Sequence, residues 1–157
     1  MLYALLKTLH LLCVILWVGG MVFAHFFLRP ALADLPAPQR LTLMHAVLRR
    51  FFAAVLWAST LAFASGGWML ARSASHAAAA GLAPHLPLEW LVMAVLGTLM
   101  VLIFLFLRLQ ALPRLGRAVQ AQAWPQAAAA LALIRRGVMV NLGLGLAVVL
   151  VTLLGGA

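Results

Sequence analysis

The sequence predicts an all-α protein that sits in a membrane as a four-helix bundle. Hydrophobic residues make up 67% of the 157 residues and charged residues only 8%, whereas soluble domains run at roughly 45–50% apolar and about 25% charged. The apolar residues gather in four continuous runs, which excludes a soluble enzyme and a disordered chain. A chain of this length has room for one transmembrane domain, 1–157.

Each apolar run is long enough to be a membrane span, since a helix crosses the hydrocarbon core with about 20 residues. We expect spans at approximately 2–28, 51–70, 88–107 and 137–154. The runs are continuous rather than alternating, which favours helices over the strands of a barrel. The first run exceeds the roughly 7–15 apolar residues of a signal peptide. We therefore expect it to be a retained helix.

The charge pattern predicts the orientation of the bundle. The sequence has eleven Lys and Arg residues but only two acidic residues, Asp34 and Glu89, which gives a net charge of +9. Two segments hold most of the cations, one between the first two spans and one between the last two: Arg29, Arg40, Arg49, Arg50, Arg108, Arg114, Arg117, Arg135 and Arg136. By the positive-inside rule these loops are cytoplasmic, and both termini are periplasmic if the membrane is a bacterial inner membrane. The partner of these basic segments is then the lipid bilayer. Nucleic-acid binding is excluded because no basic stripe carries interleaved aromatic residues.

Prolines in the basic segments indicate where helices restart. Pro36 and Pro38 break the chain, and residues 39–50 can then continue as an extension of the second span. Trp124-Pro125 precedes an alanine-rich run, and proline is favoured in the first turn of a helix. We expect both extensions to lie at the membrane interface.

The two halves of the chain repeat a pattern of helix, basic segment and helix. Related motifs occur in the same order in each half, Phe27-Leu28-Arg29 and Leu48-Arg49-Arg50 in the first and Phe106-Leu107-Arg108 and Ile134-Arg135-Arg136 in the second. This indicates two parallel-repeat helical hairpins. The alternative is that arginine simply marks any helix end before a cytoplasmic loop.

Polar residues inside an apolar span are costly and are candidates for function. In the first span Lys7, His10 and Trp17 follow each other at one and two helical turns, which places them on a related face. We expect His10 to ligate a metal or cofactor, Lys7 to pair with an anionic group such as a haem propionate, and Trp17 to wall the pocket. Asn141 in the fourth span can hydrogen-bond a cofactor or a neighbouring helix.

The other histidines supply further candidate ligands. His25 and His45 lie near the inner surface and could ligate haem iron or copper from two helices, or else bond headgroups and carbonyls. Cys13 follows His10 by one turn and could add a soft ligand or pack in the core. His76 and His85 flank the external segment and could capture a metal there. The two acids lie in loops or at span boundaries, so no carboxylate pair exists for hydrolytic chemistry, and no particular catalytic reaction is predicted.

Short motifs spread over nearly the whole chain resemble the copper-resistance protein D (CopD) family. They are Lys7-Thr8-Leu9-His10, Trp17-Val18-Gly19-Gly20-Met21, Arg29-Pro30-Ala31-Leu32, Leu48-Arg49-Arg50-Phe51-Phe52, Ser65-Gly66-Gly67-Trp68, Ala123-Trp124-Pro125-Gln126-Ala127, Ile134-Arg135-Arg136 and Asn141-Leu142-Gly143-Leu144-Gly145. The resemblance implies a small inner-membrane helical protein that handles copper ions in uptake or tolerance. It also implies a periplasmic copper carrier or a redox partner.

A second resemblance leads to a different cofactor. Lys7, His10, Trp17 and Arg29 are similar to the first helix of the HemJ-type protoporphyrinogen oxidases, which implies binding of b-type haem. The Trp-Pro segment and the fourth helix depart from that pattern. Three functions are therefore open: a copper-handling protein, a haem b redox protein, and an accessory membrane subunit.

Overall fold

The computed structural model describes residues 1–79 and 88–155, and all the secondary structure in these ranges is helical. The elements in chain order are α1 (Leu2–Val22), η1 (Phe23–Leu28), α2 (Arg29–Ala31), α3 (Ala37–Ala79), α4 (Leu88–Phe106), η2 (Leu107–Ala111), α5 (Leu112–Gln120) and α6 (Trp124–Gly155). Successive elements join into four helical rods that are long and apolar enough to cross a membrane, namely Leu2–Ala31, Ala37–Ala79, Leu88–Gln120 and Trp124–Leu154. The predicted all-α membrane fold with four spans is confirmed.

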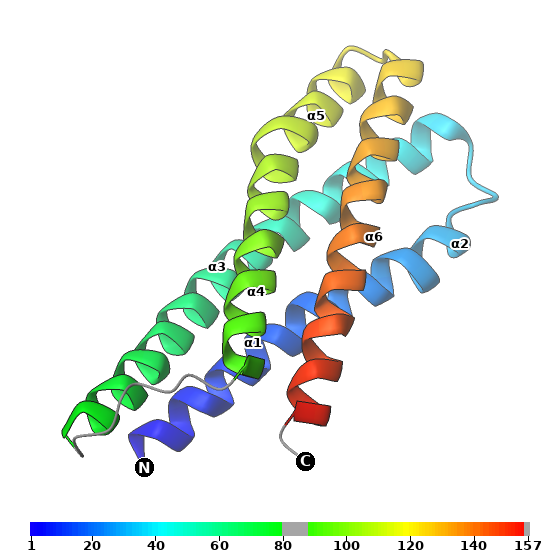
Figure 1. Cartoon of the computed structure of the whole chain (residues 1–157). Coiled ribbons are helices and arrows are strands. Elements are labelled where there is room, and N and C mark those ends of the chain that lie inside the picture. The colour runs from blue at the N-terminus through cyan, green and yellow to red at the C-terminus, as the bar shows by residue number, and fades with distance from the viewer. Residues whose placement is uncertain (80–87, 156–157) are drawn as a thin grey trace.

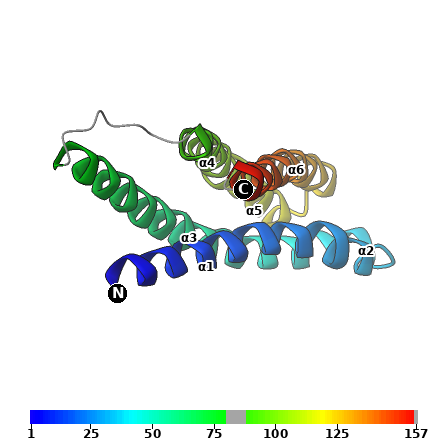
Figure 2. The ribbon, with the colours of Figure 1, turned by 60° about the horizontal axis from the view of Figure 1, so that its bottom comes forward.

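The four rods alternate in direction, so both termini lie at one end of the molecule and the basic connections lie at the other (Figure 1). The first hairpin consists of α1 and α3, and the second of α4, α5 and α6. Viewed from below, the two hairpins form two layers, and α3 diverges from α4 toward its C-terminal end (Figure 2). The two layers are therefore further apart at the C-terminal end of α3 than along the rest of the bundle.

Three of the rods extend well beyond the predicted spans at that basic end. With 43 residues, α3 is about 65 Å long, roughly twice the hydrocarbon thickness of a bilayer. Its first four turns, roughly, contain the extension over residues 39–50 that the sequence predicts, and α6 likewise begins at Trp124. The third rod is longer than predicted, because it continues through the basic segment to Gln120.

The physical reason for this continuation is that α5 is amphipathic. Leu112 and Leu115 are buried against the rest of the bundle, while Arg114 and Arg117 on the other face are exposed. An apolar stripe at helical spacing stabilises a helix by packing even where its composition is polar overall. A prediction that takes arginines as the sign of a loop overlooks this helical spacing of apolar residues.

A π-helical segment ends the apolar part of the first helix in each hairpin, and a proline follows each one. The segment η1 precedes Pro30 in α2, and η2 precedes Pro113 in α5. Proline cannot donate a backbone hydrogen bond, and its ring clashes with the carbonyl four residues earlier. Inserting one extra residue per turn relieves this conflict without ending the helix. The same device in both hairpins supports the predicted parallel repeat.

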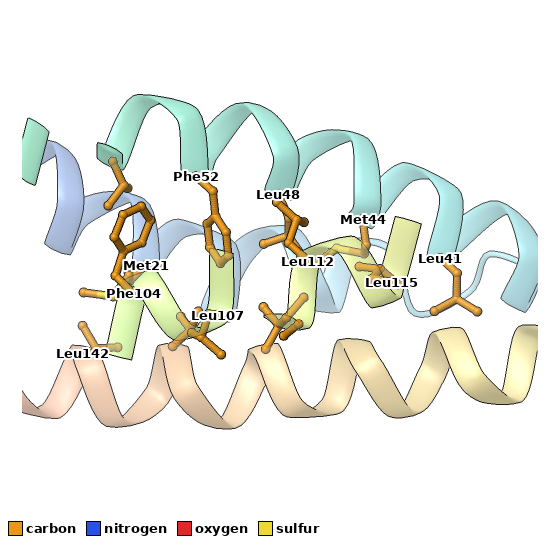
Figure 3. Packing of buried hydrophobic residues seen from close by; sticks show 14 of the residues in the cluster. Met21, Leu41, Met44, Leu48, Phe52, Phe104, Leu107, Leu112, Leu115 and Leu142 are labelled. Carbon is orange, nitrogen blue, oxygen red and sulfur yellow. The ribbon is translucent and has the colours of Figure 1, made fainter. Parts of the chain in front are cut away.

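The main hydrophobic core joins all four rods in the basic half of the bundle. Phe52 of α3 packs edge-on against Phe104 of α4, with 5.7 Å between the ring centroids. Met21 and Leu142 lie beside this pair, and Leu41, Met44, Leu112 and Leu115 extend the core toward the basic end (Figure 3). A second, smaller cluster joins only α1 and α3 and consists of Cys13, Ala58 and Ala62.

Candidate functional site

The α1–α3 contact holds the imidazole of His10, the strongest candidate ligand in the sequence. His10 is part-buried, and its Nδ1 lies 2.9 Å from the backbone oxygen of Ala62 and 3.3 Å from the hydroxyl oxygen of Ser65. The hydroxyl of Ser65 itself donates to the carbonyl of Leu61 at 2.7 Å. The ring is therefore held by two oxygen atoms of the neighbouring helix.

These partners fix which nitrogen of His10 carries the proton. A carbonyl oxygen can only accept a hydrogen bond, so Nδ1 must donate to Ala62. In the neutral imidazole Nε2 then keeps its lone pair and is the nitrogen able to coordinate a metal. Histidine ligands in metal sites have this arrangement, in which the second ring nitrogen donates to a carbonyl or carboxylate that orients the ring.

Small residues on α3 make room for the ring. A Cβ atom at Gly66 would lie 3.2 Å from Cε1 of His10, which is closer than ordinary van der Waals contact. At the adjacent Gly67 a Cβ atom would meet nothing within 4 Å. Gly66 therefore sets the distance of the imidazole from α3, and Gly67 has no such role.

Cys13 lies one helical turn from His10 and packs on the same part of α3. Its side chain is buried and belongs to the cluster with Ala58 and Ala62, and Ala62 also supplies the carbonyl that binds His10. Cys13 is the single cysteine of the sequence and forms no disulfide. An imidazole nitrogen and a soft sulfur thus share one neighbouring residue at this helix contact.

The other three candidates for cofactor binding lie in different surroundings. Lys7 is exposed on α1. Trp17 is buried and packs edge-on against Phe104 of α4, with 5.8 Å between the ring centroids. Asn141 is 2% exposed and donates from Nδ2 to the backbone oxygen of Met100 at 3.0 Å, which links α6 to α4.

The remaining histidines are also distributed over separate places. His25 is in η1 and lines a cavity near the basic end, whereas His45 of α3 packs against Gly116 of α5. His76 is exposed near the end of α3, and His85 lies outside the described residues. Within residues 1–79 and 88–155, no group of three or more His, Cys, Asp or Glu side chains comes close enough to hold a metal ion.

Sequence reasoning missed the partners of His10 on α3. In the sequence Ser65 and Gly66 stand out only as part of a motif that carries the family resemblance, and no sequence pattern marks the carbonyl of Ala62. The available signal was a serine beside a glycine inside an apolar span. A polar side chain next to a position without a side chain can form a receptor for a polar group on the facing helix.

Comparison with known proteins identifies the family. A family model described as CopD, copper resistance protein D, matches residues 45–154, which is more than half of the chain. The chain belongs to the CopD family. No curated protein and no solved structure matches it.

The CopD match confirms the family that the sequence motifs predict and ties the protein to copper resistance in a membrane. It covers α4, α5 and most of α3 and α6, including Asn141 and the Ser65-Gly66 surface that receives His10. His10 itself precedes the matched region. No match supports the resemblance to HemJ-type oxidases.

Proposed function

We propose that this CopD-family protein handles copper as cargo in the inner membrane and that His10 Nε2 is a ligand for the passing ion. Membership of the copper-resistance family carries the proposal. The hydrogen bond from His10 to Ala62 supports the choice of residue, because it orients the ring and leaves one nitrogen for coordination.

The chemistry of the α1–α3 contact suits monovalent copper. Thiolate and thioether sulfur favour Cu(I), and imidazole is also a good copper ligand. We propose Cys13 as the sulfur partner of His10, since both lie against Ala62. A pair of protein ligands holds a metal ion less firmly than a full ligand set, as transfer of cargo requires.

The predicted orientation of the bundle indicates from which side of the membrane copper reaches His10. With the termini in the periplasm, His10 lies in the outer half of the membrane, within reach of a periplasmic copper carrier or redox partner. His76, exposed near the same end of α3, then serves in capture from outside. His25 and His45 remain second-choice ligands on the inner side. Cells that express the protein should change their total copper, and the sign of the change separates uptake from tolerance.

The experiment that tests the proposal is copper retention by variants purified in detergent under reducing conditions. After loading with Cu(I) and desalting, wild-type protein should keep copper by elemental analysis, and His10→Ala should keep almost none. Thr8→Ala removes an exposed hydroxyl of α1 that bonds only the carbonyl of Ala4, and this variant should retain copper like the wild type. Unchanged retention in folded His10→Ala would reduce His10 to a packing residue.

Haem b is the second candidate, and Lys7 is the observation that favours it. A copper ion gives no reason for a cation one turn from His10, whereas a haem propionate would pair with it. A visible spectrum separates the two candidates. A Soret band that shifts on reduction supports haem, a colourless copper-loaded protein supports copper, and a protein that holds neither supports an accessory subunit.

A further inference from the structure

A cavity of about 560 Å³ lies near the basic end of the bundle, remote from the His10 contact. Its walls come from η1 and α2, from the first turns of α3 and from the first turns of α6. At this end the helices are longer than the hydrocarbon core requires, so the cavity lies at the level of the lipid headgroups.

Basic groups surround the polar part of this cavity. Arg29, Arg40 and Arg135 come from three different rods, and His25 lies beside them. None of the described residues that line the cavity is acidic. Arg40 is held in place by a hydrogen bond from its Nη1 to the backbone oxygen of Ala33 at 3.2 Å. Guanidinium groups are the preferred partners of phosphate because they donate two parallel hydrogen bonds.

The rest of the cavity is apolar and belongs to the core. Leu41, Leu48 and Ile134 are each at most 3% exposed and are already covered by the protein. Phe51, Trp124 and Leu131 also line the cavity but are only half-buried, so they keep apolar surface that a ligand can cover. Arg29 and Arg135 are exposed, so the basic groups form the rim and the aliphatic side chains form the floor. A ligand that fits both parts must carry an anionic head and an apolar chain.

We propose that this cavity is a binding site for an anionic phospholipid. The lipid phosphate is bound by Arg29, Arg40 and Arg135, and the upper part of one acyl chain packs on the half-buried side chains of Phe51, Trp124 and Leu131. A free phosphate would satisfy the rim but would leave the half-buried apolar side chains of the cavity uncovered. A site at headgroup level exchanges its ligand directly with the bilayer. The inference is independent of the copper proposal.

Native mass spectrometry of the purified full chain tests the proposal, with dioctanoyl phosphatidylglycerol as the probe. The wild type should bind one lipid, and the Arg29→Ala/Arg135→Ala variant should bind it about tenfold more weakly or worse, because two charge-assisted contacts are lost. The matched control is Arg49→Ala/Arg136→Ala, which removes the same charge from arginines that do not line the cavity. It should bind like the wild type, and equal weakening of both double variants would overturn the proposal.

A steric variant keeps the test decisive if the arginine variant folds poorly. Ala128 lines the cavity, and Ala128→Trp fills the space without changing any charge. It should reduce lipid binding while copper retention and the elution volume in gel filtration stay unchanged. Full lipid binding by Ala128→Trp would contradict the proposal. Equally tight binding of inorganic phosphate alone would also contradict the proposal and would assign the rim to a soluble anion. Loss of a Soret band in Arg29→Ala/Arg135→Ala would contradict it as well and would assign the cavity to haem.

Discussion

The imidazole of His10 is positioned by contacts that a single added methyl group can disturb. Gly66→Ala would place a Cβ atom 3.2 Å from Cε1 of His10 and push the ring a few tenths of an ångström away from α3. Changes to the residues that orient a metal ligand weaken metal binding by about 10–100-fold. We expect Gly66→Ala to lower the affinity for Cu(I) about tenfold, measured by competition with a chromophoric chelator.

The neighbouring glycine provides the control for this prediction. Gly67→Ala adds the same methyl group where nothing lies within 4 Å, so the affinity should be unchanged. If Gly66→Ala and Gly67→Ala bind Cu(I) equally well, the position of the His10 ring does not determine copper binding.

Asn141 combines one hydrogen bond with one unpaired acceptor. Its Nδ2 donates to Met100, whereas its buried Oδ1 has no partner among the described residues. Hydrogen bonds between membrane helices contribute about 0.6 kcal/mol on average, and an unpaired buried polar atom costs about 1–3 kcal/mol. We expect Asn141→Leu to stabilise the folded protein by about 1 kcal/mol, measured as a rise in the thermal unfolding midpoint in detergent. A clear fall in that midpoint would show that the unpaired oxygen has a partner that stabilises the fold.

At the scale of the helices, Gly20 of α1 lies very close to α3. A Cβ atom at Gly20 would overlap the ring of Phe51, whereas at Gly19 it would meet nothing within 4 Å. Overpacking of a tight contact costs about 1–3 kcal/mol. We expect Gly20→Ala to lower the free energy of unfolding by this amount and Gly19→Ala to leave it unchanged or slightly raised, since alanine favours helix. Equal stability of the two variants would contradict the packing of this hairpin.

The helices also show how far the sequence predicts the fold. Apolar run length predicts all four spans, and Pro36 and Trp124 mark the helix starts, because these signals are local. The helix through Arg114 and Arg117 was not predicted, since α5 is stabilised by burying Leu112 and Leu115 against other elements. Packing between elements that are distant in the sequence cannot be inferred from residue patterns along the chain.

The candidate site was predictable only in part, for the same reason. His10 is recognisable because a polar side chain in an apolar run is unusual. Its receptor is a backbone carbonyl, a serine and a glycine some 52 to 56 positions further along the chain, and only the pairing of α1 with α3 brings them together. The arginine rim likewise combines three rods whose proximity depends on how the hairpins pack.

At the scale of the whole molecule, the distribution of charge predicts which end faces the cytoplasm. In a Cys13→Ala background, Ser75→Cys places an exposed thiol near the end of α3 and Gln120→Cys places one at the basic end. An impermeant maleimide added to spheroplasts should label Ser75→Cys at once and Gln120→Cys only after the membrane is permeabilised. The reverse order of labelling would invert the bundle and move His10 to the inner half of the membrane.

The most direct test of the copper proposal is X-ray absorption at the copper edge of the Cu(I)-loaded protein. Wild-type protein should show imidazole and sulfur scattering around the ion. His10→Asn retains a donor for the Ala62 carbonyl but lacks Nε2, so the imidazole signature should disappear while the helix contact remains; Cys13→Ser should remove the sulfur signature. A spectrum of His10→Asn that is indistinguishable from the wild type, or a wild-type protein that holds no copper, would contradict the assignment of His10 as the copper ligand.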